Sequence, residues 1–120
     1  MPLRCVIVDD NARFLEQASN LLAREGIDVV AVASNSADAV RLVEEHRPDV
    51  TLVDIELGEE NGLDLARQLS EDGSKVVLVS TYAERDFAPL IESSPALGFV
   101  SKAHLSAEAI LDTLEGSKSA

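Results

Sequence analysis

The 120-residue sequence predicts an α/β fold: a doubly wound, five-stranded parallel sheet with helices on both faces. Five short apolar runs alternate with five amphipathic segments, as in parallel strands joined by right-handed helical crossovers. The strand candidates are apolar almost throughout, which is typical of strands buried on both faces. Hydrophobic residues make up 46% of the chain, enough for one packed core. We expect one domain over residues 1–116 and a polar tail or the start of a linker at 117–120.

The first half of the chain contains three strand candidates and two helix candidates. The strands are expected at Leu3–Val8, Asp28–Ala33 and Val50–Val53. A helix is expected over Ala12–Arg24, because apolar residues recur there at spacings of three and four until Gly26 ends the pattern. A second helix is expected to begin after an N-cap at Ser36 and to end before Pro48.

The second half continues the alternation. A polar, glycine-containing loop is expected from Ile55 to Gly62, and the next helix should run from Leu63 to near Gly73. The remaining strands are expected at Lys75–Val79 and Leu97–Val100, with Lys102 in a loop. The remaining helices are expected at Ala83–Glu92 and from an N-cap at Ser106 to Glu115, with a frayed tail at Gly116–Ala120.

Charge and composition exclude several functions. The chain has 22 acidic and 10 basic residues and a net charge of -12, so we expect no direct binding to nucleic acid or to anionic membranes. No apolar run approaches the roughly 20 residues of a membrane span, and the amino terminus does not resemble a signal peptide. A single cysteine excludes an internal disulfide. A cytoplasmic protein is the expectation.

Reactive side chains follow several of the predicted strands. Asp9 and Asp10 follow the first strand, Asp54 the third, Ser80 the fourth and Lys102 the fifth. With a strand order of 2-1-3-4-5, these side chains converge on one rim of the sheet, because parallel strands end at the same edge. The sequence therefore predicts a polar site at this rim.

The expected cluster of carboxylates favours a bound cation. Like charges at close spacing raise one another's pKa, so such a cluster is unfavourable without a positive partner. Mg²⁺ prefers oxygen ligands and fits Asp10, Asp54 and the backbone carbonyl of Glu56. Together with Lys102 and Ser80, this set is suited to phosphoryl transfer, in which Asp54 would be the nucleophile and form an aspartyl phosphate.

Five short segments also occur in the order and spacing of a known family. They are Val6–Asp10, Val53–Ile55, Gly62 eight positions after Asp54, Leu78–Ser80 and Gly98–Lys102. The sequence resembles, over essentially its whole length, the receiver domain of two-component response regulators, which has a flavodoxin-like fold shared with chemotaxis regulators. This resemblance implies that Asp54 is the phosphoacceptor, that Asp9 and Asp10 bind Mg²⁺, and that Lys102 contacts the phosphate. It also implies switch roles for Ser80 and Phe99.

The resemblance further implies the partners. A sensor histidine kinase would supply the phosphoryl group, and the surface of the fourth helix, fifth strand and fifth helix would change packing and form a homodimer. Lysine followed by a residue other than proline, here Ala103, is similar to receivers that precede a helix-turn-helix DNA-binding domain. We therefore expect a DNA-binding output domain beyond Ala120 that controls transcription.

Three departures from the family pattern keep an alternative open. Gly58 and Ala103 stand where the family often has proline, and Thr81 is larger than the usual alanine or glycine. The alternative is a phosphorylation-independent receiver that acts as a dimerisation or docking module. An aspartate-nucleophile phosphatase is disfavoured, because Asp54-Ile55-Glu56 lacks the Asp-x-Asp signature. We expect no enzyme activity beyond the domain's own phosphorylation and dephosphorylation.

Overall fold

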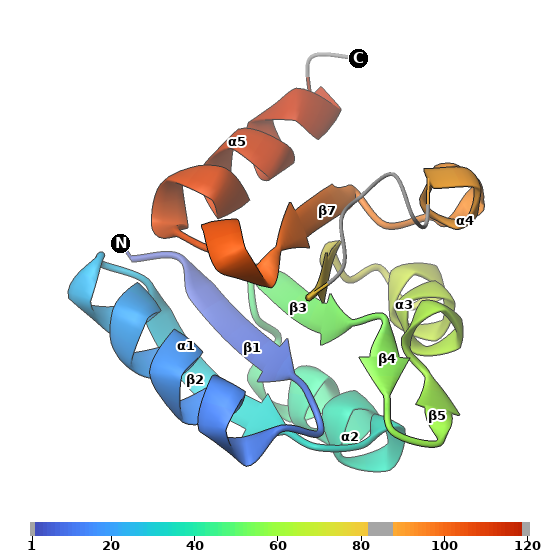
Figure 1. The fold of residues 1–120 in the computed structure, drawn as a ribbon, viewed down its shortest axis with the longest axis horizontal. Coiled ribbons are helices and arrows are strands. Elements are labelled where there is room, and N and C mark those ends of the chain that lie inside the picture. The colour runs from blue at the N-terminus through green and yellow to red at the C-terminus, as the bar shows by residue number, and fades with distance from the viewer. Residues whose placement is uncertain (1, 82–87, 119–120) are drawn as a thin grey trace.

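The computed structural model describes residues 2–81 and 88–118 and has the expected doubly wound architecture (Figure 1). Its main sheet has five parallel strands in the order β2-β1-β3-β6-β7. The strands are β1 (Arg4–Val8), β2 (Asp28–Ala33), β3 (Val50–Asp54), β6 (Val76–Ser80) and β7 (Gly98–Ser101). Since β6 and β7 are the fourth and fifth strands of this sheet along the chain, the predicted order 2-1-3-4-5 is confirmed.

Helices cover both faces of the sheet (Figure 1). The helices α1 (Ala12–Arg24) and α5 (Ala107–Lys118) pack on one face, against a core cluster that includes Ile7 and Leu52. The opposite face carries α2 (Ser36–His46), α3 (Gly62–Glu71) and α4 (Ala88–Ser93). Neighbouring residues of one strand thus contribute to different clusters, which explains the nearly continuous apolar runs of the sequence.

The helix boundaries correct several details of the sequence-based expectation. Asn35 caps α2, and Ser36 is its first residue; the Asn35 side chain accepts a hydrogen bond from Asp38 N at 2.8 Å. Asparagine is as good an N-cap as serine, so the cap one residue earlier satisfies the same backbone donors. The expected cap at Ser106 is confirmed, because its Oγ accepts from Ala109 N at 3.0 Å. The helix α5 continues past Glu115 to Lys118.

The segment expected to be a loop after β3 contains a short hairpin. Its strands are β4 (Glu56–Leu57) and β5 (Glu60–Asn61), which pair antiparallel. Gly58 has a φ of +60° in the two-residue turn between them, a conformation that glycine adopts without steric cost. Strands of two residues are too short to produce a periodic pattern, so the sequence did not reveal them.

Two further differences concern the carboxy-terminal third. Lys102 begins a short 3₁₀ helix, Lys102–His104, where a loop was expected. The expected start of the fourth helix at Ala83 lies outside the described residues. Over residues 2–81 and 88–118, no helix has the length and apolar character needed to cross a membrane.

Candidate functional site

The predicted site residues gather at the carboxyl edge of the sheet. Asp9 directly follows β1, and Asp54 and Ser80 are the last residues of β3 and β6. These three strands are neighbours in the sheet and run parallel, as the arrows of β1 and β3 show in Figure 1. Ligand oxygens of Asp9, Asp10 and Asp54 lie within 4.8 Å of one another, so the structure brings all three carboxylates together as expected.

Lys102 enters this cluster from the end of β7. Its Nζ lies 2.5 Å from Asp9 Oδ2 and 3.2 Å from Asp54 Oδ2. Burial alone would lower the pKa of Lys102, but the contact with Asp9 and the negative charges of Asp54 and Asp9 outweigh it and raise the pKa. The ammonium therefore stays charged and neutralises part of the carboxylate charge.

Asp54 is a buried carboxylate that is held at an energetic cost. Its pKa is raised from 3.8 to about 6, mainly by burial and further by the negative charge of Asp9. The backbone N–H of Glu56, which donates to Asp54 Oδ1 at 3.1 Å, and the Lys102 ammonium oppose this rise only in part. An additional positive charge at the rim would therefore stabilise the ionised form of Asp54.

The donor set fits a hard divalent cation. Asp9, Asp10 and Asp54 offer only oxygen atoms, and the Lys102 ammonium contacts two of these carboxylates, Asp9 and Asp54. Mg²⁺ is commonly held by one or two carboxylates and completes its coordination with water and phosphate oxygens. The residues at the rim thus match the chemistry that Mg²⁺ requires.

The raised pKa of Asp54 predicts how the stability of the metal-free domain depends on pH. The folded chain keeps the Asp54 proton to a higher pH than the unfolded chain, so stability falls as pH rises between these two pKa values. Between about pH 4 and pH 7, ionisation of Asp54 should lower the free energy of unfolding of the wild type by roughly 2–3 kcal/mol. We expect Asp54→Asn not to show this decrease. Urea unfolding of both proteins in EDTA, at a series of pH values, measures the difference. The prediction would be contradicted if the difference between the two free energies of unfolding did not change with pH, or if it changed in favour of the wild type as pH rises.

Gly58 explains one departure from the pattern of the resembled family. A Cβ at Gly58 would lie 3.1 Å from Asp10 Oδ2, so the hairpin turn packs closely against this exposed carboxylate. Proline, which requires a φ near −65°, is incompatible with the φ of +60° found here. The glycine is thus required by the hairpin and leaves room for Asp10.

The remaining predicted residues lie at or near the rim. Ser80 is buried and pairs with Ser101 of β7, and Phe99 is half-buried against the core on the α2 and α3 face. Their switch roles stay predictions. The side chain of Glu56 is exposed, and a metal-binding role of its carbonyl also stays a prediction. The Lys102–Ala103 peptide is trans, as are all peptide bonds of the described residues.

Two residues of the site were missed by the sequence analysis. The backbone N–H of Asn11 donates to Asp9 Oδ1 at 2.8 Å, and the Asn11 side chain caps α1. Asparagine directly before a predicted helix is an N-cap signal that could have identified it. The ring of Phe14 lies with its centroid 4.3 Å from Lys102 Nζ. No local pattern connects Phe14 with Lys102, because these two residues are distant in the sequence.

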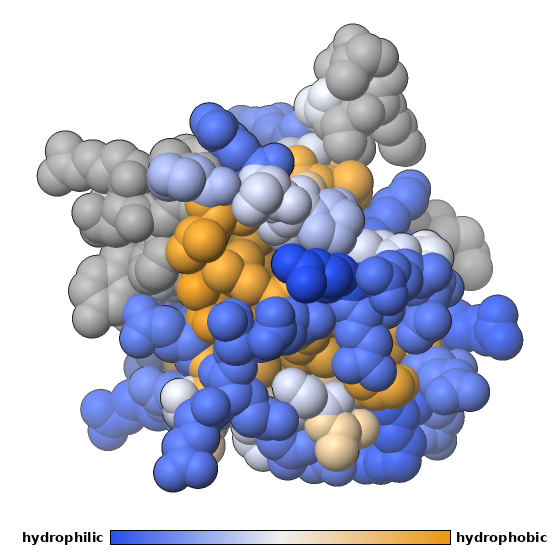
Figure 2. All heavy atoms as spheres, turned by 90° about the vertical axis from the view of Figure 1, so that its right-hand side faces the viewer, coloured by the Kyte–Doolittle hydropathy of each residue, from blue (hydrophilic) through white to orange (hydrophobic). Residues whose placement is uncertain are grey.

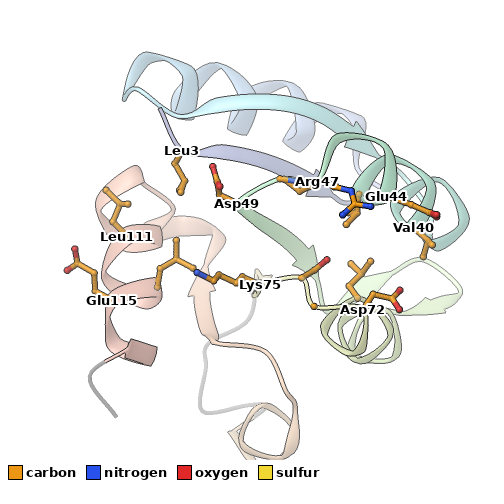
Figure 3. A pocket seen from close by; sticks show the side chains of 15 residues that line it. Leu3, Val40, Glu44, Arg47, Asp49, Asp72, Lys75, Leu111 and Glu115 are labelled. Carbon is orange, nitrogen blue, oxygen red and sulfur yellow. The ribbon is translucent and has the colours of Figure 1, made fainter. Parts of the chain in front are cut away.

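Two cavities differ in their relation to this rim. A depression of about 400 Å³ beside the site is lined by Phe14, Lys102 and the exposed Thr81, among others. A wider groove of about 900 Å³ lies at the opposite end of the sheet, where Figure 3 shows Asp49 and Lys75 among its lining residues. These two residues precede β3 and β6, so the groove is at the amino ends of the strands. None of the predicted site residues lines it.

Comparison with known proteins identifies the family. A model of the response regulator receiver domain matches residues 5–115, which include every predicted site residue. The chain belongs to the response regulator receiver family. The fold and the expected resemblance are thereby confirmed.

Relatives of this receiver domain include named regulators. It is 30% identical over 116 residues to the transcriptional regulatory protein DegU of Brevibacillus brevis, covering 94% of this chain and 49% of that protein. It is 26% identical over 103 residues to the transcriptional regulatory protein PdtaR of Mycobacterium tuberculosis, covering 85% of this chain and 50% of that protein. The chain thus spans about half the length of these curated relatives.

Solved structures agree with this assignment. A two-component response regulator of the LuxR family from Aurantimonas sp. SI85-9A1 superposes with a TM-score of 0.84 at 28% identity, covering 97% of this chain and 87% of that one. A signal receiver domain from Mycobacterium tuberculosis superposes with a TM-score of 0.82 at 27% identity, covering 98% of this chain and 97% of that one. The receiver fold therefore extends over nearly the whole chain.

Proposed function

We propose that this receiver domain accepts a phosphoryl group on Asp54, from the phosphohistidine of a sensor kinase or from a small acyl phosphate. The observation that carries the proposal is the placement of the Asp54 carboxylate between two further carboxylates and the Lys102 ammonium. Acidic residues suited to a divalent cation and a lysine suited to phosphate oxygens thus surround one nucleophile. Membership of the receiver family supports the same chemistry.

The proposed step is a simple displacement at phosphorus. An oxygen of ionised Asp54 forms a bond to phosphorus, while the bond to the donor's imidazole nitrogen or acetate oxygen breaks and the leaving group keeps the electron pair. Glu56 N–H and Lys102 Nζ, which donate to Oδ1 and Oδ2, orient the carboxylate. After transfer, Lys102 would neutralise a phosphoryl oxygen, and the Ser80 hydroxyl would donate to another.

Asp9, Asp10 and Asp54 are the residues that would hold Mg²⁺. When bound, Mg²⁺ supplies positive charge that lowers the repulsion between the phosphoryl oxygens and the carboxylates. Asp10 is the exposed member of the cluster, whereas Asp9 is fully buried in its contact with Lys102. Asp10 is therefore the carboxylate whose removal perturbs the fold least.

A variant of Asp10 tests the proposed function. We expect Asp10→Asn to abolish the NMR shifts that Mg²⁺ causes at the rim and to reduce phosphoryl uptake from acetyl phosphate at least tenfold, because one metal ligand is lost. Asp112→Asn, which removes the same charge from an exposed position on α5, is the matched control and should behave as the wild type. Wild-type protein without any Mg²⁺-dependent shift would instead favour the phosphorylation-independent docking module.

We further propose that phosphorylation changes the surface formed by α4, β7 and α5. Leu90 on α4 is a large apolar side chain that is 51% exposed. Figure 2 shows the side of the molecule that carries α3 and α4, where an apolar area interrupts a mostly hydrophilic surface. Phosphorylation generally acts by adding a local charge that shifts the equilibrium between two conformations of a surface. This surface would form the homodimer.

The names of the relatives support a wider role. Two of them are named transcriptional regulatory proteins, and one solved relative belongs to the LuxR family. We propose that the switch controls transcription through a DNA-binding output domain beyond Ala120, in the cytoplasm. This receiver domain itself would not bind nucleic acid, and it would catalyse only its own phosphorylation and dephosphorylation.

A further inference from the structure

Phe14 lies in contact with the lysine of the phosphoacceptor site. Its ring centroid is 4.3 Å from Lys102 Nζ, which is within the range of a cation–π interaction. The Lys102 side chain is only 13% exposed, so little water surrounds the ammonium. A ring face attracts a cation more strongly when the cation is desolvated. The Phe14 ring is therefore a third attractive neighbour of the ammonium, beside Asp9 and Asp54.

The position of a lysine ammonium depends on its neighbours. Lysine carries a compact charge on a flexible four-carbon stem and has no planar fork that fixes its direction. Lys102 also lies at the start of a 3₁₀ helix at the edge of the sheet. Asp9 and Asp54 attract the ammonium from the rim, whereas the ring restricts it from the side of α1. These contacts together define one position for Nζ.

The ring itself is fixed by the same loop that carries the carboxylates. Asp9 Oδ1 accepts a hydrogen bond from Asn11 N at 2.8 Å, and Asn11 Oδ1 accepts one from Phe14 N at 3.2 Å. Asn11 is the N-cap of α1, so Phe14 lies in the first turn of this helix. A carboxylate that contacts Lys102 and a ring that contacts Lys102 thus belong to one hydrogen-bonded unit of six residues, 9–14.

We propose that Phe14 is a positioning residue for Lys102, whose ring face holds the ammonium against Asp9 and Asp54 and thereby speeds phosphoryl uptake. The inference rests on the proposed function of Asp54 as phosphoacceptor. It adds a role for an aromatic residue of α1 that is distinct from the switch role predicted for Phe99. The role is electrostatic and therefore separable from packing.

Packing is the competing explanation and makes different predictions. Phe14 is half-buried and packs at the margin of the core cluster under α1 and α5. If the ring only filled space, leucine would preserve most of the rate of phosphoryl uptake, because leucine is apolar and only somewhat smaller and the site lies at the margin of the core. If the ring face attracts the ammonium, leucine at this position should slow phosphoryl uptake, and another aromatic ring should preserve it.

The first experiment compares the rate of phosphoryl uptake from acetyl phosphate with Mg²⁺. We expect Phe14→Leu to slow uptake roughly three- to thirty-fold, the range of a partly desolvated cation–π contact, and Phe14→Tyr to retain most of the wild-type rate. Fluorinated phenylalanines incorporated at position 14 should slow uptake progressively with fluorine number, because fluorine weakens the negative ring face while nearly preserving its shape. Equal rates for Phe14→Leu and wild type, or no trend with fluorination, would overturn the proposal.

The second experiment needs no phosphoryl donor. The chain has three lysines, so lysine labelled with ¹³C at the ε-carbon gives a simple NMR spectrum. We expect the ε-protons of Lys102 to be shifted upfield by the ring in the wild type and to lose this shift in Phe14→Leu. A Lys102 signal that is unchanged in Phe14→Leu would overturn the role of Phe14. Wild-type protein that shows the shift but takes up no phosphoryl group would instead refute the proposed function alone.

Discussion

Replacing Gly62 by alanine is expected to destabilise the domain by about 3 kcal/mol or more. Gly62 is the first residue of α3, and its backbone N–H donates to Ile55 O at 2.9 Å. A Cβ at this position would lie 1.8 Å from the Asp54 carbonyl oxygen, so the helix and the end of β3 would have to separate. No side-chain rotamer relieves this clash, because the contact is with backbone atoms. The separation would also displace Asp54, the proposed phosphoacceptor.

Urea unfolding measures the loss, and Gly116→Ala is the matched control. Gly116 also lies in a helix, α5, and a Cβ there meets nothing within 4 Å. We expect this control to stabilise the domain by up to about 1 kcal/mol, because alanine favours helix more than glycine does. If Gly62→Ala were as stable as the wild type, this result would contradict the close contact between the start of α3 and the end of β3.

Asp54→Asn is expected to eliminate phosphoryl uptake completely. The amide is a poor nucleophile, and no neighbouring group takes its place: Asp9 is fully buried in its contact with Lys102, and Asp10 is held at the outer side of the cluster beside Gly58. Intact-mass measurement after incubation with acetyl phosphate and Mg²⁺ tests this expectation. The wild type should gain one phosphoryl group per chain, and the variant none.

Loss of folding does not explain the expected result. Asp54 has a raised pKa, so its replacement by a neutral side chain should make the metal-free domain more stable at neutral pH. A variant that is more stable and yet inactive separates chemistry from folding. Stoichiometric uptake by Asp54→Asn would refute the assignment of the phosphoacceptor.

Much of this site could be predicted because its main residues are marked by strand ends. Asp9 and Asp54 directly follow or end apolar runs, and the parallel order of the strands then brings them to one edge. The same reasoning placed Ser80 and Lys102 near them. These predictions needed only the period of the apolar residues and the rule that parallel strands end together.

The details that could not be predicted depend on contacts between distant segments. The hairpin of β4 and β5 places Gly58 against Asp10, and its strands are too short to give a pattern. The contact of Phe14 with Lys102 joins the first helix to the last strand's end. The residue types alone would allow Gly58 and Phe14 to have several different neighbours. Only the tertiary structure shows that they contact Asp10 and Lys102.

The direct test of the central claim is to locate the phosphoryl group on the wild-type chain. The protein is incubated with acetyl phosphate, with or without Mg²⁺, and then treated with borohydride, which reduces an aspartyl phosphate to homoserine. Peptide mass spectrometry then identifies the modified residue. We expect modification of Asp54 alone, and only when Mg²⁺ is present. Modification of any other residue, or none in fully folded protein, would contradict the proposed function.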